Sequence, residues 1–327
     1  MEYKRLGRSG LKVARVCLGT MTFGREADEA TSHQLLDYYV DLGGNFIDTA
    51  DGYSNGLSEE VIGRWLRKHG GKQNLVFATK VYATMGPGPM DGGLSRMHIQ
   101  QAIEASLRRL QIDTIDLYQI HRWDYDSSPE ETLEALNDLV RQGKVRYIGC
   151  SNLAAWQLAR YLHASEKHNW SRFVSIQPIY NALNRSIENE LLPLCAAEGL
   201  GVMTYNPLAG GMLTGKYERG KPLLAGVRLE AFSMYYERYY YNEALSIVEG
   251  LIQAAQERHI SPAQLALAWV LAEERVTCPI LGARSLEQLK DTLGGLELRL
   301  TPEERASIPA AAPRRWVGKD PVYDREG

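Results

Sequence analysis

This sequence has little cysteine and no excess of one charge. Its four cysteines, Cys17, Cys150, Cys195 and Cys278, stand far apart along 327 residues. This isolation favours buried reduced thiols over disulfides or a metal site. The net charge is only −3, with Lys and Arg scattered along the chain. We therefore expect no metal, no nucleic-acid partner and no anionic membrane partner, and any anion site must be local.

Long apolar runs are missing as well. No stretch approaches the roughly 18 apolar residues of a membrane helix, and the start Met1-Glu2-Tyr3-Lys4-Arg5 is not followed by the apolar core of a signal peptide. With 44 % apolar and 24 % charged residues, the composition is that of a globular protein. These features predict a cytoplasmic location, and they leave the oligomeric state open, a homo-oligomer included.

Short apolar runs alternate with amphipathic segments along most of the chain. A β-hairpin is expected first, where residues 3–13 alternate around Gly7 and Gly10. The predicted strands span residues 16–19, 45–48, 75–80, 116–121, 145–150, 174–177, 201–205 and 277–281. The predicted helices span residues 32–42, 59–68, 96–110, 129–141, 154–168, 188–198, 242–258, 262–272 and 286–293. This alternation predicts βα units and a parallel sheet.

The length of 327 residues fits either two ordinary domains or one (β/α)8 barrel with extra loops. Eight strand–helix units without a glycine-rich dinucleotide motif after the first strand favour the closed TIM barrel over an open sheet. No Pro-, Ser- or charge-rich linker divides the chain, so residues 1–327 are expected to form one domain. The longest irregular stretch, residues 213–241 after strand seven, is a candidate lid, with a plain surface loop as the alternative.

Four reactive side chains cluster at the ends of neighbouring predicted strands. Asp48, Lys80 and His121 end strands two, three and four, and Tyr53 follows Asp48 in the next loop. Taken singly, each has a simpler role, as a helix cap, a packed ring, a solvated amine or a core histidine. Together they lie where the βα loops of a barrel build the active site. Their joint placement favours a catalytic function.

This set of residues suits the reduction of a carbonyl group. Hydride addition creates an alkoxide that needs a proton at neutral pH, yet a free phenol has a pKa of about 10. An ammonium beside Tyr53 is expected to lower its pKa, and Lys80 can supply that charge while Asp48 holds it in place. His121 can hydrogen-bond to the substrate oxygen. The prediction is proton donation by Tyr53.

The sequence resembles the aldo-keto reductase superfamily, on the branch related to the potassium-channel β subunits. The resemblance rests on Phe46-Ile47-Asp48-Thr49-Ala50-Asp51 with Tyr53, on Ser58-Glu59-Glu60, on Ala78-Thr79-Lys80, on Gln119-Ile120-His121, and on Lys144 to Gly149 with Ser151-Asn152. It extends from Leu6 to about Leu293. It implies reversible, NADPH-dependent reduction of an aldehyde or ketone. The family's catalytic tetrad maps onto Asp48, Tyr53, Lys80 and His121.

The resemblance also implies where NADPH binds. Ser151, Asn152 and Gln177 would hold the nicotinamide amide, Tyr205 would stack under its ring, and Arg284 would face the 2′-phosphate. The remaining residues assigned to the cofactor are Thr20, Met21, Asn206, Pro207, Leu208, Gly210, Lys216, Arg228, Gly282, Gln288 and Asp291. Many relatives have Asn after the acidic residue, whereas Thr292 follows Asp291 here. Phe23, Tyr82, Trp123 and the tyrosines of the candidate lid, Tyr235 among them, are the predicted substrate contacts, and they suggest an apolar or aromatic carbonyl compound.

Two other functions compete with this interpretation. The potassium-channel β subunits resemble the chain in the loop after strand seven and bind the cofactor as regulators, but they lack the histidine that stands here as His121. His121 therefore favours an enzyme. The main alternative is an NADPH-binding regulatory or redox-sensing subunit with little turnover. A metal-dependent barrel hydrolase needs His and carboxylate clusters at the strand ends, and only His121 and Asp48 qualify.

Overall fold

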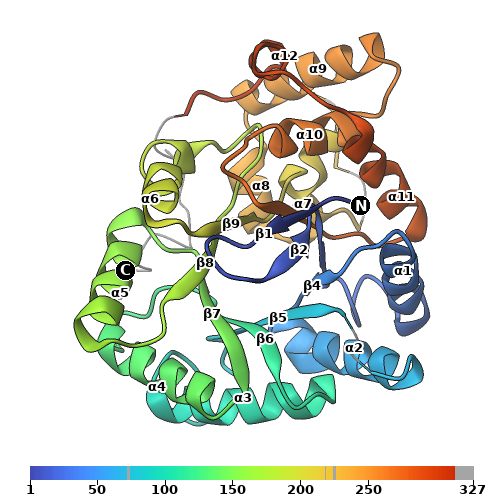
Figure 1. The fold of residues 1–327 in the computed structure, drawn as a ribbon. Helices are drawn as coiled ribbons and strands as arrows, with labels where there is room; N and C mark the ends of the chain where they lie inside the picture. Colours follow the sequence, from blue (N-terminus) through green and yellow to red (C-terminus); the bar gives the residue numbers. More distant parts are fainter. Residues whose placement is uncertain (72–73, 218, 224–225, 314–327) are drawn as a thin grey trace.

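The barrel is closed and parallel. The computed structural model describes residues 1–71, 74–217, 219–223 and 226–313. Within them, eight strands pair in chain order and the last pairs with the first (Figure 1). They are β3 (Cys17–Gly19), β4 (Phe46–Asp48), β5 (Val76–Val81), β6 (Ile115–Ile120), β7 (Val145–Ser151), β8 (Phe173–Gln177), β9 (Gly201–Thr204) and β10 (Cys278–Leu281). The predicted (β/α)8 barrel is confirmed.

Helices surround the barrel and cover its outer face (Figure 1). The predicted ones appear as α1 (Glu29–Asp41), α2 (Leu57–Lys68), α3 (Arg96–Leu110), α4 (Pro129–Arg141), α5 (Ala155–His168), α6 (Leu191–Glu198), α9 (Asn242–Glu257), α10 (Pro262–Leu271) and α11 (Leu286–Leu293). The helix predicted from residue 188 starts at Leu191 instead, because Ser186–Glu188 forms a separate 3-10 turn, η2. Two short elements, η4 (Gly294–Glu297) and α12 (Pro302–Ser307), follow α11.

Capping residues set the starts of several helices. Asp28, Ser95, Ser128 and Ser261 each accept a hydrogen bond from a backbone N–H of the first helical turn. Such caps satisfy amide groups that have no partner within the helix, and each contributes about 1 kcal/mol. The helices that follow are thus placed at fixed positions around the strands.

The predicted hairpin closes one end of the barrel. Strands β1 (Tyr3–Arg5) and β2 (Lys12–Ala14) pair antiparallel. Between them Leu6, and in β2 Val13, are fully buried, in one apolar cluster with Phe46 and Met203 of the barrel strands. Apolar burial of this kind contributes about 25 cal/mol per Å². The hairpin therefore acts as an apolar plug beneath the strands.

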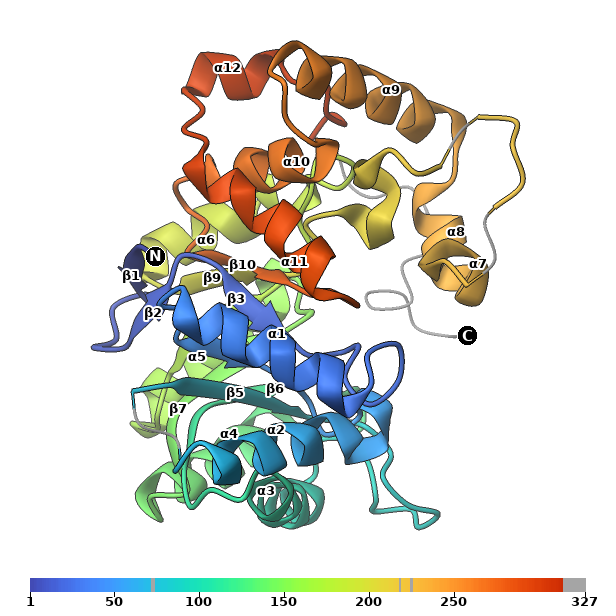
Figure 2. The same ribbon diagram turned by 90° about the vertical axis from the view of Figure 1, so that its right-hand side faces the viewer.

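The segment after β9 is more ordered than its sequence suggests. Residues 213–241 were expected to be irregular, but they contain the end of η3 (Ala209–Thr214) and the helices α7 (Arg228–Ala231) and α8 (Ser233–Tyr239). Residues 218, 224 and 225 of this stretch lie outside the described residues. The apolar periodicity of α7 and α8 is too short to be recognised in a sequence. Figure 2 shows both helices at the end of the barrel opposite the hairpin.

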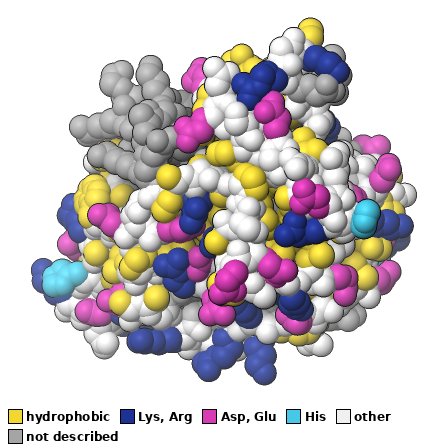
Figure 3. Space-filling model, turned by 90° about the horizontal axis from the view of Figure 1, so that it is seen from above, with side chains coloured by type: hydrophobic (Ala, Val, Ile, Leu, Met, Phe, Trp, Pro, Cys, Tyr) yellow, Lys and Arg dark blue, Asp and Glu magenta, His cyan; other side chains and the backbone are white. Residues whose placement is uncertain are grey.

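The surface charges are mixed (Figure 3), and the cysteines are free thiols. Figure 3 shows a face on which basic and acidic side chains are interspersed, in keeping with the net charge of −3. All four cysteines are buried and free. In the part of the chain that the structure describes, no helix is long and apolar enough to cross a bilayer, and no three His, Cys, Asp or Glu side chains converge on a potential metal position.

Candidate active site

A buried ion pair lies at the end of the barrel away from the hairpin. Asp48 is the last residue of β4, and Lys80 is the penultimate residue of β5, which pairs with β4. The Lys80 Nζ lies 2.6 Å from an Asp48 carboxylate oxygen, with side-chain exposures of 0 % and 2 %. Burial of a charge is costly unless it is paired and hydrogen-bonded. Two neighbouring parallel strands thus hold a cation and an anion side by side inside the protein.

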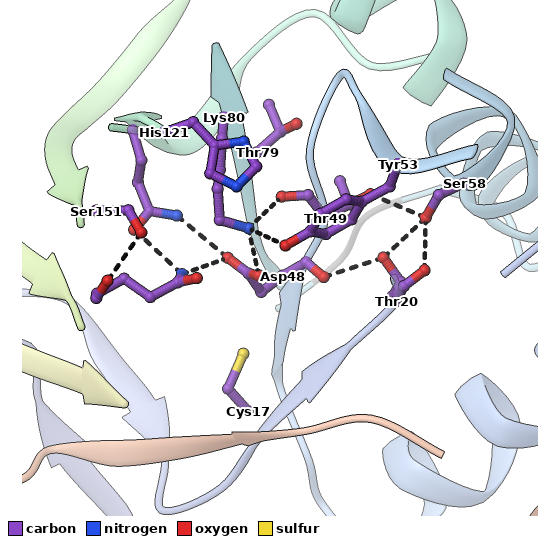
Figure 4. A network of polar contacts seen from close by, with 12 residues as sticks. Cys17, Thr20, Asp48, Thr49, Tyr53, Ser58, Thr79, Lys80, His121 and Ser151 are labelled. Atoms are coloured by element: carbon purple, nitrogen blue, oxygen red, sulfur yellow. Dashed lines mark hydrogen bonds and ion pairs between the residues drawn. The ribbon is translucent and has the colours of Figure 1, made fainter. Parts of the chain in front are cut away.

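Lys80 reaches beyond its carboxylate to Tyr53. Its Nζ also donates to the Thr49 carbonyl at 2.8 Å and to the Tyr53 hydroxyl at 3.2 Å (Figure 4). The three N–H groups of the ammonium are therefore all engaged. The same Nζ lies 4.7 Å from the centre of the Tyr53 ring. The predicted ammonium–phenol contact is present.

A strained turn presents Tyr53 to this ammonium. Tyr53 opens the 3-10 turn η1 (Tyr53–Gly56), in which Ser54 and Asn55 have φ values of 50° and 54° and Gly56 has 89°. Left-handed backbone is unfavourable for residues other than glycine, so the surroundings must hold it. The Ser54 hydroxyl donates to the Phe23 carbonyl at 2.9 Å. This bond ties the turn to the loop between β3 and α1.

The pKa values in this cluster follow from burial and charge. Burial alone lowers the pKa of Lys80, but the Asp48 carboxylate and the Tyr53 hydroxyl outweigh it, so the pKa of Lys80 is raised and the amine stays charged. For Tyr53 two effects oppose each other: burial raises the pKa of the phenol, and the Lys80 ammonium lowers it, as expected, but by less. The ammonium therefore offsets part of the desolvation of Tyr53 instead of making it more acidic than a free phenol.

His121 stands next to Tyr53 as a neutral imidazole. It follows β6 directly, and its ring centre lies 5.8 Å from that of Tyr53, in an edge-to-face arrangement. Burial, with Lys80 and Arg122 adding repulsion, lowers the pKa of His121 to about 3. An imidazole of this pKa carries one N–H at neutral pH and can hydrogen-bond without adding charge.

Two glutamines complete the environment of Asp48. The side-chain amides of Gln119 and Gln177 donate to one carboxylate oxygen of Asp48, at 3.1 and 2.9 Å. Gln119 had no predicted role, although it lies in the motif with His121; its place two residues before a strand end is the signal that could have identified it. Gln177 was expected at the nicotinamide amide, whereas its own amide nitrogen faces the carboxylate. Asp48 is thus fully hydrogen-bonded opposite Lys80.

A cavity of about 580 Å³ opens above this cluster. Asp48, Tyr53 and His121 lie in its wall, whereas Lys80 does not line it and lies behind Tyr53. Of the residues predicted to bind the cofactor, all but Ser151 line it: Thr20, Met21, Asn152, Gln177, Tyr205, Asn206, Pro207, Leu208, Gly210, Lys216, Arg228, Gly282, Arg284, Gln288 and Asp291. Ser151 is buried, and its hydroxyl donates to the Gln177 carbonyl at 2.8 Å. The volume suits a cofactor or a drug-sized ligand.

One wall of the cavity holds a fixed aromatic ring. Tyr205 follows β9, and its hydroxyl donates to the Asn152 side-chain oxygen at 2.9 Å. The Asn152 amide nitrogen donates in turn to the His121 carbonyl at 2.9 Å and to the Ser151 hydroxyl at 3.0 Å. The ring of Tyr205 therefore cannot turn freely. A flat ring held in this way is suited to stacking against a planar ligand.

Three basic side chains gather at the other end of the cavity. Lys216, Arg228 and Arg284 all line it. Burial, together with repulsion by Arg284 and Arg228, lowers the pKa of Lys216. Arg228 is paired with Glu26 at 3.3 Å, and Arg284 donates to the Gly226 carbonyl at 3.0 Å. Cations that repel one another in a partly buried position favour the binding of an anion such as a phosphate.

The backbone beside these cations allows a ligand to come close. Gly210 and Gly211 in η3 have φ values of 65° and 93°, in the left-handed region that glycine adopts most easily. A Cβ atom at Gly211 would lie 2.7 Å from the Lys216 Nζ. The loop therefore brings bare backbone and a cation to the same point of the cavity.

The predicted substrate contacts are not in the cavity wall. Phe23 is fully buried and serves the Tyr53 turn through its carbonyl group. Trp123 is 7 % exposed and packs against Trp156 and Tyr161. The Tyr82 ring lies under the Arg122 guanidinium at 5.4 Å. Three residues of α8 line the cavity instead: Tyr235, which is one of the tyrosines of the candidate lid, and Met234 and Arg238, which sequence reasoning did not single out.

Asp291 has a structural partner on the adenine side of the predicted site. Its carboxylate accepts hydrogen bonds from the Ser261 hydroxyl at 3.0 Å and from the Gln264 amide at 3.2 Å. Thr292, which stands where many relatives have Asn, is buried and donates to the Gln288 carbonyl at 2.9 Å. The position after Asp291 thus makes a hydrogen bond within α11 and also lines the cavity.

Comparison with known proteins identifies relatives over nearly the whole chain. Residues 15–312 match the family described as the aldo/keto reductase family. The chain is 41 % identical over 313 residues to the uncharacterized oxidoreductase YrpG of Bacillus subtilis, covering 93 % of both chains. It is 39 % identical to Protein tas of Escherichia coli, over 95 % of this chain and 97 % of that protein. It is 37 % identical to a probable voltage-gated potassium channel subunit beta of Arabidopsis thaliana, over 91 % and 92 % of the two chains.

Proposed function

This chain belongs to the aldo/keto reductase family, and from that premise we propose that it reduces an aldehyde or ketone to the alcohol with NADPH, reversibly. One observation carries the proposal. The Lys80 ammonium contacts both Asp48, at 2.6 Å, and the Tyr53 hydroxyl, at 3.2 Å, and that hydroxyl lies in a cavity wall beside His121. A structural ion pair has no need of a phenol that faces a cavity.

Each side chain of the cluster has one task in this reaction. NADPH, when bound, supplies the hydride. Tyr53 donates its proton to the oxygen of the substrate, and Lys80 stabilises the phenolate that remains. The neutral imidazole of His121 can donate its single N–H to the same oxygen. Asp48 and its two glutamines keep Lys80 charged and oriented.

The residues of the cavity fit the proposed cofactor. Tyr205 offers a fixed ring for stacking, the glycine backbone at Gly211 lies beside the Lys216 ammonium, and three cations line the same cavity. Arg284 is our candidate for the 2′-phosphate that distinguishes NADPH from NADH. Arg284→Ala should raise the Michaelis constant for NADPH about tenfold or more and leave that for NADH nearly unchanged, because a charge-assisted hydrogen bond is worth about 1.5–3 kcal/mol. Equal effects on the two cofactors would remove Arg284 from this role.

The substrate side of the cavity is apolar and aromatic. Met21, Met234 and Tyr235 line the cavity together with Tyr53 and His121. We infer a small apolar or aromatic carbonyl compound, since such walls bind apolar surface.

The test of this function is turnover with a panel of aldehydes, ketones, sugars and steroids. The consumption of NADPH is measured with and without each compound. The expected outcome is reduction of at least one aromatic aldehyde. Tyr53→Phe should lower this turnover by about 10²- to 10⁴-fold, the usual contribution of a general acid, while NADPH still binds. A Tyr53→Phe enzyme with a near-normal rate would exclude Tyr53 as the proton donor.

The same experiment separates the main alternative. The similarity to a protein named as a potassium channel subunit beta favours a cofactor-binding regulatory or redox-sensing subunit as the second candidate. Such a subunit would bind NADPH without consuming it. That residues 1–327 form one domain stays a prediction.

A further inference from the structure

The helix α8 follows α7 after a single intervening residue and carries side chains into the cavity. Met234, Tyr235 and Arg238 of α8 line the cavity. Tyr239, the last residue of the helix, is 0 % exposed and points to the barrel instead. It is the residue through which α8 contacts the end of β9, and the proposed chemistry gives it no role.

Two asparagines meet at the Tyr239 hydroxyl. The side-chain amide of Asn206, two residues beyond β9, donates to this oxygen at 2.8 Å, and that of Asn181, in the loop after β8, donates at 3.2 Å. Asn181 is fully buried, and its amide also donates to the Asn206 carbonyl at 3.0 Å. The hydroxyl thus accepts two hydrogen bonds from two separate strand ends.

The same asparagine sets the backbone of the loop from Asn206 to Lys216, the cofactor loop, which we propose for the pyrophosphate of NADPH. The Asn206 side-chain oxygen accepts from the Gly210 N–H at 2.7 Å. Because the Gly210 N–H can only donate, the Asn206 oxygen must face it, and the Asn206 nitrogen then faces Tyr239. Asn206 itself has a left-handed φ of 63°, which such side-chain bonds support. Loss of the hydroxyl would leave this nitrogen without its acceptor on α8.

A second contact joins the same two elements. A Cβ atom at Gly210 would lie 2.6 Å from the Tyr235 ring, so the bare backbone of the loop packs directly on α8. Helix and loop are therefore in contact at Tyr235 and hydrogen-bonded through Tyr239 and Asn206. A shift in the position of the helix should therefore shift the loop as well.

We propose that the buried hydroxyl of Tyr239 couples the helix α8 to the cofactor loop and so sets how tightly NADPH is held. Tyr239 acts as a positioning residue: it touches neither substrate nor the reacting atoms, and it works through Asn206 and Asn181. The inference rests on the proposed function in that NADPH is the ligand. It adds that cofactor retention is controlled from a residue outside the cavity wall.

The test compares Tyr239→Phe with a matched control on the same helix. Tyr236→Phe also removes one hydroxyl from α8, but Tyr236 is 42 % exposed and stacks on Tyr240. NADPH dissociation constants are measured by fluorescence titration. Tyr239→Phe should weaken binding roughly 5- to 50-fold, because two buried amide donors lose their acceptor. Tyr236→Phe should stay within about twofold.

Two further measurements distinguish positioning from a merely structural role. The single-turnover rate of Tyr239→Phe at saturating NADPH should stay within about twofold of wild type, since the hydroxyl does not touch the reacting atoms. Hydrogen exchange of residues 228–239 should slow on addition of NADPH in the wild type and respond less in the variant. A variant with a lower melting temperature but an unchanged NADPH dissociation constant would overturn the inference.

The outcome also tells the inference apart from the proposed function. If the wild-type protein binds NADPH and Tyr239→Phe binds it equally well, the coupling is wrong and the reductase proposal stands. If the wild-type protein binds no NADPH, the proposed function is wrong and the coupling falls with it.

Discussion

The two ends of the barrel use the same strands for opposite purposes. At the hairpin end, Leu6 and Val13 meet apolar side chains and are fully buried. At the other end, Asp48 and Lys80 are nearly as deeply buried but charged, and two glutamine amides hydrogen-bond to the carboxylate. Burial stabilises the first end by removing apolar surface from water, whereas at the second it must first overcome the desolvation of charges. The contrast shows where this fold gives up stability for chemistry.

Lys80→Met, at the cavity end of the barrel, should have the largest effect on activity and on stability. It removes the ammonium from Tyr53, so we expect a loss of carbonyl reduction of about 10²- to 10⁴-fold. It also leaves the Asp48 carboxylate buried without its cation, which costs about 3–5 kcal/mol of unfolding free energy. Activity assays and urea unfolding measure the two effects.

The double variant Asp48→Asn with Lys80→Met is the control for this prediction. With both charges removed, most of the stability should return, because no unpaired charge remains, while activity should stay low. Recovery of activity in the double variant would show that the ammonium is not needed.

Leu6→Ala should act at the hairpin end alone. Truncation of a fully buried leucine costs about 2–5 kcal/mol of unfolding free energy. Leu6 does not line the cavity, so turnover and the NADPH dissociation constant at 25 °C should match wild type. Leu42→Ala, at a leucine that is 41 % exposed, is the control and should change stability by less than about 0.5 kcal/mol. A specific loss of turnover in Leu6→Ala would mean that the two ends are not independent.

Asp51→Asn should show the smallest effect and the opposite sign. Burial, with Glu59 adding repulsion, raises the pKa of Asp51 to about 7. An aspartate in the unfolded chain has a pKa near 3.9, so between about pH 4 and 7 the folded state binds more protons and stability falls as the pH rises. The amide removes this loss. We expect Asp51→Asn to gain about 1–3 kcal/mol at pH 8 and little at pH 4.

Urea unfolding at about pH 4, 6 and 8 measures how the free energy of unfolding depends on pH. Asp41→Asn, at the exposed end of α1, is the control and should leave the slope unchanged. An Asp51→Asn protein with the wild-type pH dependence would assign the slope to other groups.

Much of the fold could be predicted because its signals are local. The helices α3, α4 and α11 begin and end where their amphipathic pattern predicts, and all eight barrel strands overlap their predicted ranges. Helices α7 and α8 were missed, because four and seven residues carry too little periodicity to be recognised. Met234 and Arg238 of the cavity wall were missed for a related reason: the direction of a side chain in this segment depends on the path of the chain that leads to it.

By itself, the sequence determined the alternation of strands and helices, the closed barrel, and which four reactive side chains stand at neighbouring strand ends. Only the tertiary structure decided how those groups behave. Burial in the folded protein raises the pKa of the Tyr53 phenol. The fold also brings the Gln177 amide to the Asp48 carboxylate, and the Tyr239 hydroxyl to the Asn206 amide. The physical reason is that periodicity reports which face of an element is buried, whereas pKa values and hydrogen-bond partners depend on atoms brought together from distant parts of the chain.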